Sequence, residues 1–136
     1  MGLSLKHLSF QSLRHCLTLL FRDLPDRRQQ AKVQHTMHDV VMSGFAMMYF
    51  QDASLLQFQR RLREDEGSDK LSTIFKVETI PEDTQMRRVL DIVDPQEFRP
   101  GFKSYLHRLQ RGKHLEQYQL FDRSYLGCRN LRVRTA

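Results

Sequence analysis

Apolar residues recur along most of this chain with the three- and four-residue spacing of amphipathic helices. The first such stripe lies in residues 3–21, and Leu24-Pro25 ends it because the residue before proline disfavours helical backbone. The pattern predicts an all-α domain of five or six helices. The expected helices span residues 3–21, 33–50, 54–66, 70–75, 82–93 and 95–111.

The helix expected at 33–50 should be the buried centre of the fold. Residues 40–50 carry little polarity on any side, which is typical of a helix surrounded by other elements. Gly44 lowers helix propensity there, and we expect it to allow a close approach by a neighbouring helix.

Two capping patterns mark helix starts. Ser54 with Gln57 matches a capping box, and Asp94-Pro95 with Glu97 forms the strongest boundary in the chain. Gly112 is the expected stop of the last helix. Apolar side chains predicted to face inward from these two helices are Leu55, Phe58, Leu62, Phe98, Phe102, Tyr105, Leu106 and Leu109.

Residues 70–93 read as two helices joined by a turn that contains Pro81, with Val77 and Ile80 directed into the core. A pair of helices joined in this way is a candidate helix-turn-helix, whose second helix enters the major groove of DNA. Glycine is frequent in such turns, and Lys76 stands at the corresponding position.

Composition fits one soluble domain of 136 residues with a formal net charge of +6. The basic balance is compatible with a nucleic-acid partner, although 16 acidic residues rule out a simple polybasic arm. Cys16 and Cys128 stand alone, as expected in a reducing cytoplasm. Neither a signal peptide nor a run long enough to cross a membrane is present, so we expect a cytoplasmic protein without a membrane partner.

Catalytic and metal chemistry have weak support. His35 and His38 share a helix face but lack further ligands, and the acidic run at 64–66 is typical of a solvated helix end. The sequence shows no glycine-rich phosphate loop and no nucleophile–base arrangement. We therefore expect neither a metal site nor a catalytic site in this chain.

DNA binding is the chemistry that the sequence favours most. On the second helix of the 70–93 unit, Gln85 is suited to adenine and Arg88 to guanine. The alternative interpretation is a basic solvated surface. The candidate DNA-binding residues are Thr84, Gln85, Arg87, Arg88, Arg60, Arg61 and Lys103.

Several blocks resemble the N-terminal region of insertion-sequence transposases of the DDE class. They are residues 52–58 (DASLLQF), 72–91 (STIFKVETIPEDTQMRRVLD), Asp94-Pro95 and 109–113 (LQRGK). The resemblance covers residues 25–126 in order and spacing. It implies a helical domain that precedes a catalytic domain with three metal-binding carboxylates, so the divalent metal would belong to that other domain. The implied division is an N-terminal helix at 1–24, the family-like domain at 25–126 and a frayed tail at 127–136.

The chain departs from the family after Tyr125-Leu126. There the family has a strand that ends in Asp-Gly-Thr, with the first catalytic Asp, whereas residues 127–136 read GCRNLRVRTA. This departure predicts a chain truncated before the active site by a frameshift. Three interpretations stay open. The chain is an inactive fragment that binds transposon-end DNA, an interaction fragment, or a product without function. The interaction fragment would pair with full-length transposase and inhibit it, or would associate with itself.

Overall fold

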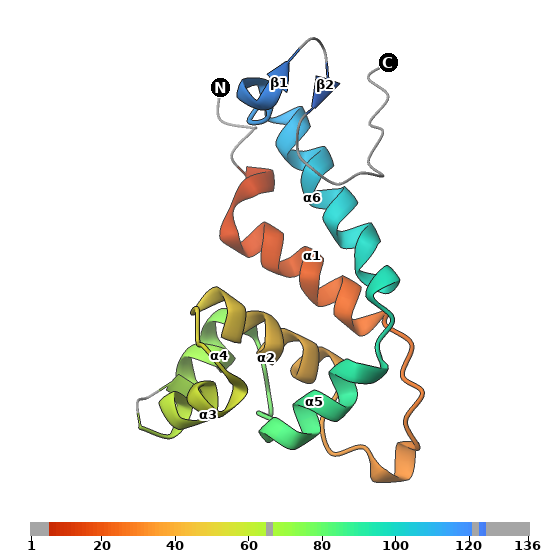
Figure 1. The fold of residues 1–136 in the computed structure, drawn as a ribbon, viewed down its shortest axis with the longest axis vertical. Coiled ribbons are helices and arrows are strands. Elements are labelled where there is room, and N and C mark those ends of the chain that lie inside the picture. The colour runs from red at the N-terminus through yellow and green to blue at the C-terminus, as the bar shows by residue number, and fades with distance from the viewer. Residues whose placement is uncertain (1–5, 65–66, 121–122, 125–136) are drawn as a thin grey trace.

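The computed structural model describes residues 6–64, 67–120 and 123–124, and its architecture is helical (Figure 1). The six α-helices are α1 (Phe10–Arg22), α2 (Met37–Tyr49), α3 (Leu55–Glu64), α4 (Gly67–Phe75), α5 (Asp83–Ile92) and α6 (Arg99–Arg111). Four 3-10 turns accompany them: η1 (Lys6–Leu8), η2 (Gln30–Lys32), η3 (Pro95–Phe98) and η4 (Glu116–Tyr118). Two short antiparallel strands, β1 (Gln119–Leu120) and β2 (Arg123–Ser124), follow. The all-α prediction is confirmed, apart from this two-residue ladder. The tail predicted at 127–136 lies outside the described residues.

Helix α2 is the centre of the fold, as predicted. Residues 37–44 are all buried, and α2 packs against α1, α4 and α5. The helix begins at Met37 rather than at Val33, because Thr36 caps it by accepting a hydrogen bond from the Asp39 N–H at 3.1 Å. Gly44 permits the expected close approach: a Cβ at this position would lie 3.3 Å from Leu90 of α5.

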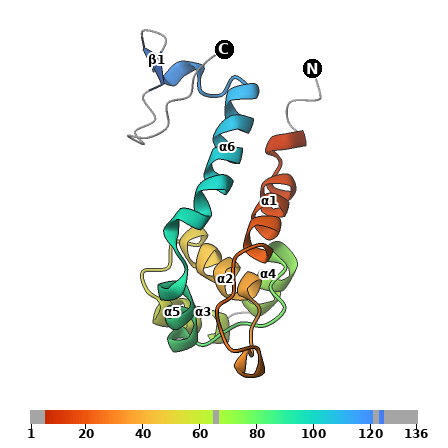
Figure 2. The ribbon, with the colours of Figure 1, turned by 90° about the vertical axis from the view of Figure 1, so that its right-hand side faces the viewer.

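The helices form two layers along the long axis of the molecule. Helices α1 and α6 lie side by side in the upper part of Figures 1 and 2, while α2, α3, α4 and α5 form the lower part. Aromatic rings join α1, α2 and α4. The buried Phe75 ring makes edge-to-face contacts with Phe10, Phe45, Tyr49 and Phe50 at centroid distances of 5.4–6.1 Å. Each such pair adds about 0.5–1.5 kcal/mol beyond the area that it buries.

The buried carboxylate of Asp39 ties α2 to the segment between α4 and α5. Asp39 is 2% exposed, and its oxygens accept hydrogen bonds from the Glu78 N–H, the Thr79 N–H and the Thr79 hydroxyl at 3.0–3.1 Å. On the opposite side of Thr79, the His35 Nδ1 lies 2.8 Å from the hydroxyl. Asp39 therefore holds the first part of residues 76–82 against α2.

The two helices predicted in residues 70–93 are confirmed, but the tight turn expected between them is wrong. The connection spans residues 76–82, whereas a helix-turn-helix uses three or four residues. Lys76 adopts a left-handed φ of 57°, the conformation for which glycine is usual, and Val77 beyond it is 2% exposed as predicted. Helix α4 packs mainly on α3 and α2, and α5 mainly on α2 and α3, so the two helices share a support.

Helix α6 departs from its predicted inward face at one position. Phe102 is 66% exposed, while Phe98 and Tyr105 are half-buried and pack toward the core. The periodicity places Phe102 on the apolar side of the helix, but no described element covers its side chain there. The cap predicted at Ser54 is present, because Ser54 Oγ accepts from the Gln57 N–H at 3.1 Å. Asp94 accepts from the Gln96 N–H at 2.9 Å, but it caps the 3-10 turn η3, and α6 begins at Arg99 rather than at residue 95.

The α1–α6 contact depends on polar anchors. The Tyr105 hydroxyl donates to the Leu13 carbonyl at 2.7 Å. Arg108 donates to the His7 carbonyl at 2.9 Å and to the Ser12 hydroxyl at 2.8 Å. Burial raises the pKa of Tyr105 to about 12, with a smaller contribution from the nearby Cys16 and an opposing one from Arg108.

Replacing Asp39 tests the link between α2 and residues 76–82. Asp39→Ala leaves the Glu78 and Thr79 donors without their acceptor and a cavity beside α2, so we expect a loss of about 2 kcal/mol in the free energy of unfolding. Asp39→Asn should also destabilise the protein, because its NH₂ group faces N–H donors. Urea denaturation followed by circular dichroism measures both. Asp91→Ala, an exposed carboxylate on α5, is the matched control. Equal stability of the Asp39 and Asp91 variants would contradict the proposed link.

Tyr105 predicts a pH dependence at the alkaline end. Its folded-state pKa of about 12 is above the ordinary 10, so its contribution is fully present below pH 10 and is lost as the pH rises toward 12. Tyr105→Phe removes the hydrogen bond to Leu13, which should cost about 1 kcal/mol at pH 8. The difference between the wild type and this variant should shrink above pH 10. Tyr118→Phe, at an exposed position, is the control. A difference that stays constant from pH 8 to pH 12 would refute the assignment.

Candidate nucleic-acid interface

A polar cleft lies between α5 and the segment of residues 28–35. Its volume is about 370 Å³, and Val40, Val89 and Ile92 supply its apolar part. Its polar lining combines guanidinium, ammonium, amide and imidazole groups. These residues are Arg28, Gln29, Lys32, Gln34, His35, Gln85 and Arg88.

Two of the sequence-predicted DNA-binding residues lie in this cleft. Gln85 and Arg88 are three positions apart on α5, so they share one face of the helix. The Gln85 amide donates to the Gln34 amide oxygen at 2.8 Å, which joins α5 to the opposite wall. Thr84 and Arg87 are exposed on the same helix outside the cleft lining.

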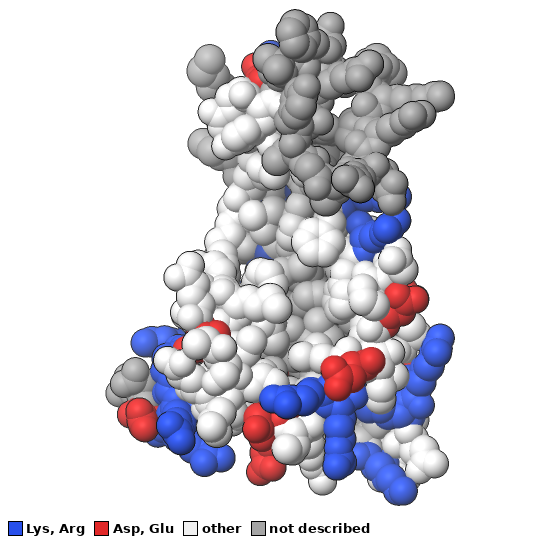
Figure 3. Space-filling view, viewed as in Figure 1, with Lys and Arg blue, Asp and Glu red and all other residues white. Residues whose placement is uncertain are grey.

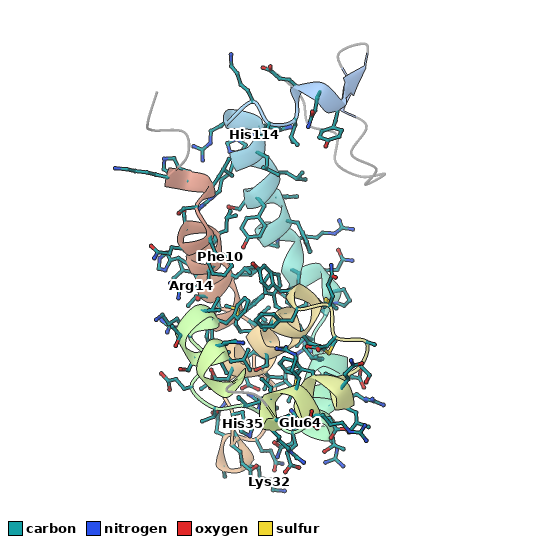
Figure 4. The ribbon with its side chains drawn as sticks, turned by 90° about the vertical axis from the view of Figure 1, so that its left-hand side faces the viewer. Phe10, Arg14, Lys32, His35, Glu64 and His114 are labelled. Carbon is teal, nitrogen blue, oxygen red and sulfur yellow. The ribbon has the colours of Figure 1, made fainter. Side chains whose placement is uncertain are left out.

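The opposite wall was missed from the sequence. Lys32 and His35 lie near one another at the lower end of the molecule in Figure 4, far from His114. Lys32 lies just before the helix expected at 33–50, and Gln34 lies within its expected first turn. Pattern alone gave no signal that this segment would lie against α5, because the Asp39 and His35 contacts that hold it involve residues about forty positions later.

The cations of the cleft differ in their availability. Arg28 makes two hydrogen bonds to the Asp26 carboxylate, at 2.6 and 2.7 Å, and this pairing lowers the pKa of Asp26. Lys32 and Arg88 are exposed and form no ion pair within the described part of the chain. Among the cations of the cleft, Lys32 and Arg88 are therefore the ones that can reach a phosphate or a base.

The two predicted DNA-binding residues on α3 also differ in whether a carboxylate pairs with them. Arg61 is a predicted DNA-binding residue, but its guanidinium pairs with Asp52 at 2.6 Å and lies 4.4 Å from the Phe50 ring centroid. Asp52 is largely buried, so Arg61 holds the end of α2 against α3. Arg60 is exposed and unpaired among the described residues. Lys103 is exposed on α6, in the other layer of the molecule (Figure 1).

The histidine pairs do not form a metal site in the described structure. His38 is buried beside Asp39 at 3.4 Å, and His35 bonds to Thr79. Within residues 6–64, 67–120 and 123–124, no three His, Cys, Asp or Glu side chains gather as metal ligands would. In the same residues, no helix has the length and apolar character needed to span a bilayer.

A second concavity is apolar. It has a volume of about 480 Å³ and lies among α1, α2, α5 and α6, where Figure 3 shows a largely uncharged surface. Met48 and Phe102 in its lining are 73% and 66% exposed. Its other lining residues are Leu17, Leu20, Phe21, Val41, Gly44, Phe45, Met47, Leu55, Leu90, Val93, Pro95, Phe98, Gly101 and Tyr105.

Comparison with known proteins places the chain in a family. A family model described as DDE_Tnp_1-associated matches residues 18–106, well over half of the 136 residues. Neither the curated proteins nor the solved structures gave a match. The match covers α2 to α5 completely, the last five residues of α1 and most of α6. It includes the whole lining of the first cleft and all of the apolar concavity except Leu17. The resemblance to the N-terminal region of a DDE transposase is thereby confirmed, and the chain belongs to the DDE_Tnp_1-associated family, whose domain lies N-terminal to DDE transposase domains.

Proposed function

We propose that this transposase-related chain binds DNA of its mobile element through the polar cleft and the exposed face of α5. The observation that carries the proposal is the convergence of Gln85, Arg88, Gln34 and Lys32 on one surface. Amide and guanidinium groups form the bidentate hydrogen bonds that distinguish adenine and guanine, and an ammonium group suits a phosphate.

The dimensions of α5 suit the major groove. A helix with its side chains is about 10–12 Å across, and the groove is about 12 Å wide, so the ten residues of α5 can lie in it. In this arrangement Thr84, Gln85 and Arg88 meet base edges, and Lys32 contacts a phosphate of the DNA backbone beside the groove. Ile92, which is 58% exposed at the edge of the cleft, provides apolar contact for a thymine methyl group.

Binding measurements with two substitutions test this function. Gln85→Ala and Arg88→Ala should each weaken binding to a duplex carrying a transposon end by about 5- to 150-fold, equivalent to about 1–3 kcal/mol. Binding to a random duplex should change less, because phosphate contacts remain. Fluorescence anisotropy at fixed salt measures both affinities. Gln57→Ala, an exposed glutamine on α3, is the control and should leave both unchanged. A wild-type chain that binds neither duplex at low salt would refute the proposal.

The apolar concavity supports a second candidate function, which is pairing with a DDE transposase. Its large exposed side chains, Met48 and Phe102, are unusual for a surface that faces only water. The matched family is defined by its association with a transposase domain, which makes that domain the natural partner.

Co-purification after nuclease treatment separates this function from DNA binding. A tagged chain should retain a full-length DDE transposase when DNA has been digested. Phe102→Glu should reduce the retained amount at least tenfold, because it places a charge in an apolar interface. Leu56→Glu is the matched control, since Leu56 is 54% exposed and lies outside the concavity. Retention that disappears with nuclease in the wild type would exclude direct pairing.

A further inference from the structure

Positive charge is segregated along this chain. Residues 26–92, which contain the cleft, carry ten Lys or Arg and eleven Asp or Glu, so they are close to neutral. In contrast, residues 6–22 and 99–115 contain no Asp or Glu at all. These two segments carry eight of the 22 basic residues: Lys6, Arg14, Arg22, Arg99, Lys103, Arg108, Arg111 and Lys113.

The fold brings the two carboxylate-free segments together. They are almost a hundred residues apart in sequence, yet α1 and α6 lie side by side in both ribbon views. The contact is close: a Cβ at Gly101 would stand 2.5 Å from the Leu20 side chain. Arg108 bridges the helices through uncharged acceptors, including the Cys16 sulfur at 2.6 Å, so its positive charge is not neutralised by a carboxylate.

Helix α6 presents the charges as a stripe. Arg99, Lys103, His107 and Arg111 follow one another at four-residue intervals, and all four are exposed. Each interval turns the helix by about 40° beyond one full turn, so the side chains remain on one side. The stripe is about 18 Å long, which corresponds to about five nucleotides of one DNA strand at 3.4 Å each.

We propose that α1 and α6 form a phosphate-binding arm that holds DNA independently of base sequence, a role that rests on the proposed function of the chain. The near-neutral region around the cleft can discriminate bases but attracts a polyanion weakly. The carboxylate-free arm supplies the missing attraction, because its exposed cations add to the same positive field. The kind of ligand is duplex DNA, contacted through its phosphates.

Salt dependence is the property that tests the arm. Replacing Arg99, Lys103 and Arg111 together by Gln should weaken binding to a random duplex at least tenfold at low salt. It should also make the slope of log K against log [salt] shallower by about 2–3, because about 0.9 of slope accompanies each phosphate contact. The ratio of affinities for transposon-end and random duplex should be retained. Anisotropy titrations at several salt concentrations measure all three quantities.

A matched variant removes the same charge from the near-neutral region. Arg63, Lys70 and Lys76 are exposed there, and replacing all three by Gln should change the salt slope by less than 1. Thermal melting confirms that both triple variants are folded. Equal slopes for the two triple variants would overturn the arm.

The failure of the arm is distinguishable from the failure of the cleft. If the arm variant binds like the wild type while Gln85→Ala and Arg88→Ala still lose affinity, the arm is wrong and base reading stands. If the arm variant loses its salt slope while the Gln85 and Arg88 substitutions leave discrimination unchanged, the arm stands. Binding to phosphatidylserine vesicles but to no duplex would overturn the arm as a DNA site and assign it to lipid headgroups.

Discussion

The buried carboxylate of Asp39 is the interaction on which the arrangement of the lower helices depends. A carboxylate that is 2% exposed is tolerable only when hydrogen bonds replace its water, and its donors here are Glu78 and Thr79. The segment 76–82 must therefore lie against α2. Because α5 begins where that segment ends, the same contacts orient the helix that carries Gln85 and Arg88.

Features that depend on neighbouring residues were predictable from the sequence. The central helix, the caps at Ser54 and Asp94, and the close approach at Gly44 were expected from spacing and side-chain chemistry, and the structure confirms them. Half of the cleft was predictable for the same reason, since Gln85 and Arg88 share a face on any regular helix.

Features that depend on distant residues were not predictable. The pattern around Arg61 gives it an outward face, but the bend after α2 brings Asp52 and Phe50 beneath its guanidinium. Phe102 has the spacing of a core residue, but α1 and α6 pack in a way that leaves its side chain exposed. The cationic arm could not be predicted from the sequence, because its two segments are separated by the near-neutral middle of the chain and only the fold brings them together.

The short connection between α5 and α6 has a mechanical consequence. Residues 93–98 include the 3-10 turn η3, which Asp94 caps, and this connection leads directly from one helix into the other. A ligand held by both helices is therefore bound in two places that are joined by only six residues. Once one helix has bound the ligand, the other helix meets its site at a high effective concentration, so two modest contacts give a high combined affinity. The short connection also limits how far apart the two contacts can lie, so it restricts the spacing of the sites on any ligand that occupies both.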